Sequence, residues 1–138
     1  MPKQTMVIGL GQFGMALARA LAENGGEVLA VDVNAAHIHD IAPHVADAVL
    51  MDAMDEEALA ALDPARRDTC VCAIGDDNRE GSIIVTALLK QLGARHIVAR
   101  ATDDLHARIR SLVGAHEVIN PERSYGERLA VRLAWRNV

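Results

Sequence analysis

Val7-Ile8-Gly9-Leu10-Gly11-Gln12-Phe13-Gly14 is an apolar run that leads into three glycines with the spacing G-x-G-x-x-G. Apolar residues recur at helical spacing over residues 13–22, so the stretch predicts a strand that turns directly into a helix. In such a turn Gly9 permits the tight bend, Gly11 lets a phosphate approach the backbone, and Gly14 lets the helix pack on the sheet. The free N–H groups at the start of the helix then attract the phosphate.

Asp32 supplies the context that the glycine spacing alone lacks. It closes the next apolar run, Val28–Val31, and follows Gly14 by 18 residues. A carboxylate there accepts hydrogen bonds from ribose hydroxyls and repels a 2′-phosphate, so we expect NAD, ATP, ADP or AMP rather than NADP. The alternative is a tight strand–helix turn that binds no ligand. The nucleotide-binding residues predicted in this part of the chain are Gly9, Gly11, Gln12, Phe13, Gly14, Asp32 and Asn34, the last of which is also the expected N-cap of the next helix.

Apolar runs alternate with helical patterns along the whole chain, in about six strand–helix units. This alternation predicts an α/β fold, Rossmann-like and doubly wound, with a mainly parallel six-stranded sheet and helices on both faces. The fourth run, Thr69–Ile74, is continuously apolar and is expected to be a central strand. Pro121 is expected to begin a last helix that ends near Trp135. We see no internal repeat or linker, so residues 1–138 predict a single nucleotide-binding domain.

In this class of fold a ligand lies beyond the carboxyl ends of the strands, where the strand order reverses. Two pairs of residues follow predicted strands there: Asp52-Ala53 would border the adenine, and Ile74-Gly75 would approach the ribose and phosphate. Arg100 ends the fifth strand, where its guanidinium would reach a phosphate oxygen. Glu122 starts the last helix as a candidate cation ligand, although an acid in a first helical turn also stabilises the helix by itself.

Two further groups of polar residues are interpreted without a ligand. His37, His39 and His44 lie on a predicted polar helix, and no cysteine or acid stands at a recognised zinc spacing from them, so we interpret them as surface histidines. Asp76-Asp77, followed by Glu80, is interpreted as the acidic start of a helix rather than as a cation site.

The composition is that of a globular protein, with 51% hydrophobic and 24% charged residues in 138. A net charge of -5 and an aromatic content of 2% argue against nucleic acid as a partner, because binding nucleic acid requires basic surfaces or aromatic rings on which bases stack. The first residues show no signal peptide, no apolar run reaches the length of a membrane span, and we expect a cytoplasmic protein. Cys70 and Cys72 are expected to be buried thiols.

No catalytic motif stands beside the predicted nucleotide site. Tyr125 is not followed by the lysine that a short-chain dehydrogenase places four residues later, and neither G-x-S-x-G nor a Walker A loop occurs. A dehydrogenase also needs further residues that bind substrate and move a proton. The sequence therefore favours a sensor, which is not an enzyme, over a catalyst.

Five segments together resemble the N-terminal domain of potassium-transport regulators, known as the RCK, KTN or TrkA-N domain. They are Val7–Gly14, Val28–Asp32, Asp52-Ala53, Val71–Gly75 and Val118–Glu122. The chain is most similar to the cytosolic gating-ring subunit of Ktr-type transporters. The resemblance extends from Gln4 to about Val131, and its most specific part is Asn120–Arg123 followed by Tyr125-Gly126.

The resemblance implies a regulatory subunit that binds ATP or ADP, as in the Ktr type, or NAD(H), as in the Trk type. Such domains form homodimers and an octameric ring at the inner face of the membrane, below a potassium channel that the bound nucleotide opens or closes. By position, the family's ribose-binding acid corresponds to Asp32 and its basic phosphate-binding residue to Arg100. The acid that helps to hold Mg²⁺ or another divalent cation near the dimer partner corresponds to Glu122.

Three features differ from the family pattern or extend it. Gln12 stands where many Ktr-type sequences have an arginine that reaches the terminal phosphate across the dimer, so the preference for ATP over ADP is left open. A smaller C-terminal domain normally follows, so we expect a chain ending at Val138 to be an excised domain or a shortened regulator. The last helix, with its apolar residues up to Trp135, is expected to serve assembly. The alternative function is an NAD(H)-binding redox sensor or the cofactor-binding half of an oxidoreductase.

Overall fold

A computed structural model describes residues 1–135 of the chain. Six strands form one sheet in the order β3-β2-β1-β4-β5-β6, and all five pairings are parallel. This confirms the predicted Rossmann-like α/β fold. The elements are β1 Gln4–Ile8, α1 Gln12–Glu23, β2 Glu27–Asp32, α2 Ala35–Ile41, η1 Ala42–His44, β3 Asp47–Leu50, α3 Glu56–Ala60, η2 Pro64–Arg66, β4 Thr69–Cys72, η3 Asp76–Asn78, α4 Arg79–Gln91, β5 Ile97–Arg100, α5 Asp104–Val113, β6 Glu117–Ile119 and α6 Pro121–Trp135.

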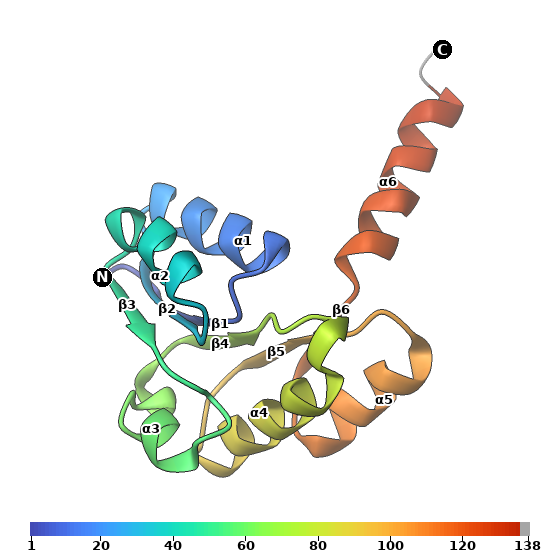
Figure 1. The fold of residues 1–138 in the computed structure, drawn as a ribbon. Coiled ribbons are helices and arrows are strands. Elements are labelled where there is room, and N and C mark those ends of the chain that lie inside the picture. Colours follow the sequence, from blue (N-terminus) through green and yellow to red (C-terminus); the bar gives the residue numbers. More distant parts are fainter. Residues whose placement is uncertain (136–138) are drawn as a thin grey trace.

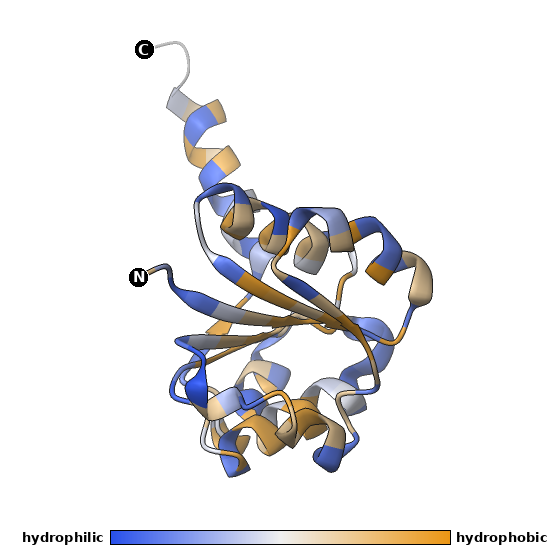
Figure 2. Cartoon of the chain, turned by 90° about the vertical axis from the view of Figure 1, so that its left-hand side faces the viewer, coloured by the Kyte–Doolittle hydropathy of each residue, from blue (hydrophilic) through white to orange (hydrophobic). Residues whose placement is uncertain are grey.

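Helices cover both faces of the sheet, with α1 and α2 on one side and α3, α4 and α5 on the other (Figure 1). Successive strand residues point to opposite faces, so Met6 and Ile8 pack toward α3 and α4 while Val7 packs toward α1 and α2. Apart from Thr5, the buried positions of the central strands β1 and β4 are therefore apolar. Figure 2 shows these hydrophobic strands between helices that carry both hydrophilic and hydrophobic residues.

The loop between β1 and α1 owes its shape to two glycines. Gly9 has a φ of +95°, a conformation that side chains with a Cβ rarely adopt, and its N–H donates to the carbonyl oxygen of Val31 at 2.9 Å. A Cβ on Gly14 would lie 1.8 Å from the carbonyl oxygen of Gly9. These contacts bring the start of α1 directly against the carboxyl end of β1.

Local signals place most element boundaries. The side chain of Asn34 accepts hydrogen bonds from the N–H groups of Ala36 and His37 and caps α2, as predicted. Helix α2 ends at Ile41 and the chain continues as the 3₁₀ turn η1, because Pro43 lacks the N–H that an α-helix needs.

The two cysteines are buried and free, as the sequence predicts. Burial raises the pKa of the Cys70 thiol to about 12 and also raises that of Cys72, because the thiolate form is poorly solvated inside the core.

Helix α6 begins at Pro121, as predicted, continues to Trp135, the last residue that the structure describes, and stands away from the sheet (Figure 1). None of its residues is buried, and Val131 and Trp135 are 62% and 67% exposed. Within residues 1–135, no helix is both long and apolar enough to cross a membrane.

Candidate ligand-binding site

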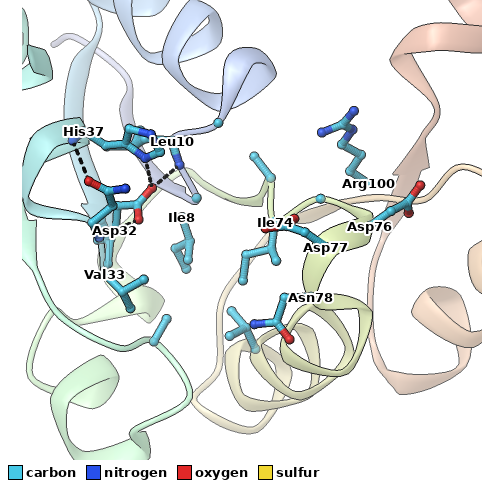
Figure 3. A pocket seen from close by; sticks show the side chains of 18 of the residues that line it. Ile8, Leu10, Asp32, Val33, His37, Ile74, Asp76, Asp77, Asn78 and Arg100 are labelled. Atoms are coloured by element: carbon cyan, nitrogen blue, oxygen red, sulfur yellow. Dashed lines mark hydrogen bonds and ion pairs between the residues drawn. The ribbon is translucent and has the colours of Figure 1, made fainter.

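A pocket of about 630 Å³ opens beyond the carboxyl ends of the strands, where the order reverses between β1 and β4 (Figure 3). This is the position that the fold class predicts for a ligand. The predicted site residues that line it are Gly9, Gly11, Gln12, Asp32, Asn34, Asp52, Ala53, Ile74, Gly75, Arg100 and Glu122. Phe13 and Gly14 do not line the pocket: Gly14 packs against Gly9, and the ring of Phe13 lies beneath Arg100.

Gly11 differs from the other two glycines of the loop. Its φ of −68° suits any residue, and a Cβ built on it would meet no atom within 4 Å. Neither backbone strain nor packing within the chain therefore requires glycine at this position. The space beside it belongs to the pocket and lies at the N-terminus of the 12-residue helix α1. Free N–H groups and the positive end of the helix dipole favour an anion there.

Asp32 is the most enclosed acid of the pocket, with a side chain that is 11% exposed. Its Oδ2 accepts a hydrogen bond from the N–H of Leu10 at 2.6 Å, and its Oδ1 accepts one from the N–H of Asn34 at 2.9 Å. Partial burial raises the pKa of the carboxyl group, but the hydrogen bonds from Asn34, Leu10 and His37 outweigh this and hold the pKa below its usual value. Asp32 is therefore ionised at neutral pH.

His37 is partly exposed, as expected, with a side chain that is 38% exposed, but its interpretation as a residue without a place in the site is incomplete. Its Nδ1 lies 3.1 Å from Oδ2 of Asp32, and the residue lines the pocket. The spacing to Asp32 could have indicated this, because a residue five positions after the end of β2 falls in the first turn of α2, beside that carboxylate. His39 is exposed on the same helix and does not line the pocket, as expected.

Arg100 and Glu122 meet at the other end of the pocket and form an ion pair. The guanidinium of Arg100 also lies 5.5 Å from the centre of the Phe13 ring, at a distance that allows a cation–π contact. Its Nε is buried and has no hydrogen-bond partner among residues 1–135. The sequence placed Arg100 and Glu122 in the same site, but only the structure shows that they contact each other.

Asp76 is held by side chains at the same end of the pocket. Its Oδ2 accepts a hydrogen bond from the hydroxyl of Thr102 at 2.7 Å, which together with Arg79 lowers the pKa of the Asp76 carboxyl. Asp76 and Asp77 lie in the first turn of the 3₁₀ helix η3, in agreement with their interpretation as an acidic helix start. The part of the chain that the structure describes contains no group of three or more His, Cys, Asp or Glu side chains that could hold a metal ion.

Sequence reasoning missed an apolar wall of the pocket. It consists of Val33, which follows β2, and of Met51 and Met54, which follow β3. Ala53 is buried between the two methionines. Their position just after predicted strands was the available signal. The wall borders Asp32, whereas Arg100 lies across the cavity (Figure 3). The pocket thus combines an apolar side, a carboxylate, free helical N–H groups and a guanidinium, which are groups that bind a nucleoside phosphate.

The TrkA-N domain family model matches residues 5–121 of the chain. The chain is 37% identical over 138 residues to Ktr system potassium uptake protein C of Bacillus subtilis (strain 168). The match covers 100% of this chain and 62% of that protein. It is 36% identical over 136 residues to Ktr system potassium uptake protein A of Vibrio alginolyticus, covering 99% and 61% of the two chains. The chain thus spans about three-fifths of the length of these relatives.

Solved structures share the fold at lower identity. The NAD(P)-binding domain of an exopolyphosphatase-related protein from Archaeoglobus fulgidus superposes with a TM-score of 0.83 at 23% identity, covering 94% of this chain and 96% of that one. The GsuK channel bound to NAD (TM-score 0.80, 18% identity, 96% and 24% covered) and GsuK bound to ADP (TM-score 0.79, 18% identity, 96% and 35% covered) are also similar. Because the family model matches nearly the whole described chain, and the fold agrees with it, this chain belongs to the TrkA-N domain family.

Proposed function

We propose that this chain is a regulatory, non-catalytic nucleotide-binding domain that gates a membrane potassium channel or transporter, with ATP or ADP as its ligand. One observation carries the nucleotide part of this proposal. Gly11 has no reason within the chain to be glycine, yet it borders the pocket at the N-terminus of α1, close to an ionised Asp32. The similarity to potassium uptake proteins supports the transport part.

The pocket offers each part of an adenine nucleotide a matching group. Asp32 is placed to accept hydrogen bonds from the ribose, and the apolar wall of Val33, Met51 and Met54 suits the adenine ring. The N–H groups at the start of α1 suit the first phosphates. Arg100 suits a more distant phosphate oxygen, because it lines the pocket across from Asp32 (Figure 3).

The ion pair between Arg100 and Glu122 offers a route from the nucleotide to α6. It joins the end of β5 to the first turn of a helix that has no buried residue. A phosphate that binds Arg100 competes with Glu122 for the guanidinium. The released carboxylate is then available to the proposed divalent cation, together with phosphate oxygens. If α6 can take two positions, two different nucleotides shift the balance between them only as far as each nucleotide binds the two forms of the domain with unequal affinity.

We further propose that the domain acts as a homodimer within a larger ring, octameric in the family pattern, on the cytoplasmic side of its membrane partner. Support comes from the relatives, which are named potassium uptake proteins, and from the exposed apolar residues of α6. A surface helix with exposed apolar side chains gains from burial against another chain.

Calorimetric titration with ATP, ADP, AMP, NAD and NADH, with and without Mg²⁺, tests the ligand. Asp32→Ala is expected to weaken every adenosine ligand alike, by roughly tenfold or more, because all of them present the same ribose. Asp40→Ala is the matched control, since Asp40 is an exposed acid on α2 that does not line the pocket. Equal affinities of wild type and Asp32→Ala for ADP would contradict the proposal.

An NAD(H)-binding redox sensor is the second candidate function. The similar GsuK structures contain NAD in one case and ADP in another, so the fold accommodates both. In the same titration, markedly tighter binding of NADH or NAD than of ADP and ATP would favour this candidate. Reduction of a hydride acceptor by bound NADH would favour an oxidoreductase instead.

A further inference from the structure

The hydrogen bonds of Asp32 leave too few acceptor positions for a ribose. Its Oδ2 accepts from the N–H of Leu10 at 2.6 Å and contacts Nδ1 of His37 at 3.1 Å, while its Oδ1 accepts from the N–H of Asn34 at 2.9 Å. A carboxylate has about four lone-pair positions. Three of them are already taken by this chain, so about one remains for a ligand.

A ribose presents two neighbouring hydroxyl groups to such a site, at its 2′ and 3′ carbons. Each hydroxyl donates one hydrogen bond. Since Asp32 can accept from only one of them while its present contacts persist, the second hydroxyl needs another acceptor. A buried hydroxyl without an acceptor would weaken binding.

His37 is placed to be that acceptor. The carboxylate of Asp32 only accepts hydrogen bonds, so Nδ1 of His37 carries the proton between them. In the neutral imidazole, Nε2 then has a free lone pair. His37 lines the same pocket and has a side chain that is 38% exposed. Figure 3 shows its ring beside Asp32, at the end of the cavity away from Arg100.

We propose that His37 is a second ribose-binding residue, whose imidazole accepts a hydrogen bond from one ribose hydroxyl while Asp32 accepts from the other. The inference rests on the proposed function, because it concerns how the same pocket recognises the sugar of an adenine nucleotide. The hydrogen bond from His37 to Asp32 then has a second role, because it holds the imidazole in the tautomer whose Nε2 can accept a hydrogen bond from the ligand.

Titration calorimetry with ADP, 2′-deoxy-ADP and 3′-deoxy-ADP tests the proposal on wild type and His37→Ala. Wild type is expected to bind ADP about 3- to 10-fold more tightly than either deoxy analogue, the value of one hydrogen bond. His37→Ala is expected to bind ADP more weakly by a similar factor. It should bind one analogue as wild type does, namely the one that lacks the hydroxyl contacted by His37.

Two further variants separate binding from structure. His39→Ala removes an exposed histidine from the same helix and is expected to leave all three affinities unchanged. His37→Gln keeps a donor and an acceptor on a side chain of comparable reach, and it should recover part of the affinity for ADP.

The proposal is wrong if His37→Ala binds ADP as tightly as wild type or more tightly, since His37 would then contribute nothing to binding or would obstruct the ribose. It is also wrong if His37→Ala loses the same factor for ADP and for both analogues, which would indicate a general distortion. In either case wild type still binds ADP and the proposed function stands. If wild type binds no ADP, the proposed function itself is wrong.

Discussion

Gly11 and Gly14 are glycines of the same loop for opposite reasons. A Cβ at Gly11 meets nothing, whereas a Cβ at Gly14 meets a backbone oxygen at 1.8 Å. Gly11→Ala is therefore expected to leave the free energy of unfolding within about 0.5 kcal/mol of wild type. It should weaken ADP binding by roughly tenfold or more, because the methyl group enters the space for the phosphate. Thermal unfolding and calorimetry on the same samples measure both effects.

Gly14→Ala is the contrasting variant for this prediction. Its methyl group has to displace the backbone of Gly9, so it should destabilise the fold by roughly 1–3 kcal/mol or more. If Gly11→Ala also unfolds more easily, the space beside Gly11 serves the fold and not a ligand.

Asp32 also makes a pH-dependent contribution to stability. Its pKa in the folded chain lies below the usual 3.8, so the ionised form stabilises the fold above about pH 4 and this stabilisation is lost as the pH falls through the folded pKa. Asp32→Asn is expected to lower the free energy of unfolding at pH 7 by roughly 1–2 kcal/mol, and by less at pH 3. Urea unfolding at several pH values measures the difference. A pH-independent loss, or an equal loss in Asp40→Asn, would argue against this role of the charge.

The end of β5 and the start of α6 are joined by Arg100 and Glu122. If Arg100 binds phosphate, Arg100→Gln should weaken ADP by roughly tenfold and leave the affinity for adenosine unchanged, because adenosine has no phosphate. Arg123→Gln is the matched control: Arg123 pairs with Asp104 at 3.1 Å and does not line the pocket. An equal loss for ADP and adenosine would assign Arg100 a structural role only.

The first turn of α6 is also where the proposed cation acts. Glu122→Gln should abolish any tightening of ADP binding by Mg²⁺ while leaving cation-free binding nearly intact, since the amide is a much weaker ligand for a hard cation. Glu127→Gln, on the exposed surface of the same helix, should keep the full Mg²⁺ effect. Calorimetry with Mg²⁺ at about the millimolar level, and with a chelator in its place, measures the cation effect. A Mg²⁺ effect that survives in Glu122→Gln would place the cation elsewhere.

Within residues 1–135, helices cover the core of the sheet, whereas α6 has no buried residue (Figure 1). Residues along α6 that are usually buried are exposed here, among them Tyr125 at 59%, Val131 at 62% and Trp135 at 67%. If they contact a second copy of the chain, Trp135→Ser should weaken self-association by roughly tenfold or more, because interface tryptophans commonly carry a large share of the binding energy. Sedimentation velocity over a range of concentrations measures this.

Arg132→Ser, also exposed on α6, is the control for self-association and should have a smaller effect. Since Trp135 is 67% exposed, thermal unfolding of Trp135→Ser at low concentration should match wild type. If wild type remains monomeric at all concentrations, another partner or no partner covers this helix.

The sequence by itself determined the class of fold, the glycine loop, the acid that closes β2 and the start of α6. These features depend on neighbours within one or two turns of chain. Gly14 packs against the backbone of Gly9 in the same turn, Asn34 caps the helix that follows it, and Pro121 starts the helix in which it lies. The period of the apolar residues and the glycine, proline and capping residues at element ends are sufficient to predict such features.

Only the tertiary structure decided which of these residues meet. The ion pair of Arg100 with Glu122 needs β5 beside β6, and the contact of His37 with Asp32 depends on the direction in which the first turn of α2 presents its side chains. Phe13 followed the loop motif in sequence but packs under Arg100 rather than into the pocket. Such contacts are set by strand order and helix phase, and a local pattern specifies neither to within the few ångströms that a hydrogen bond requires.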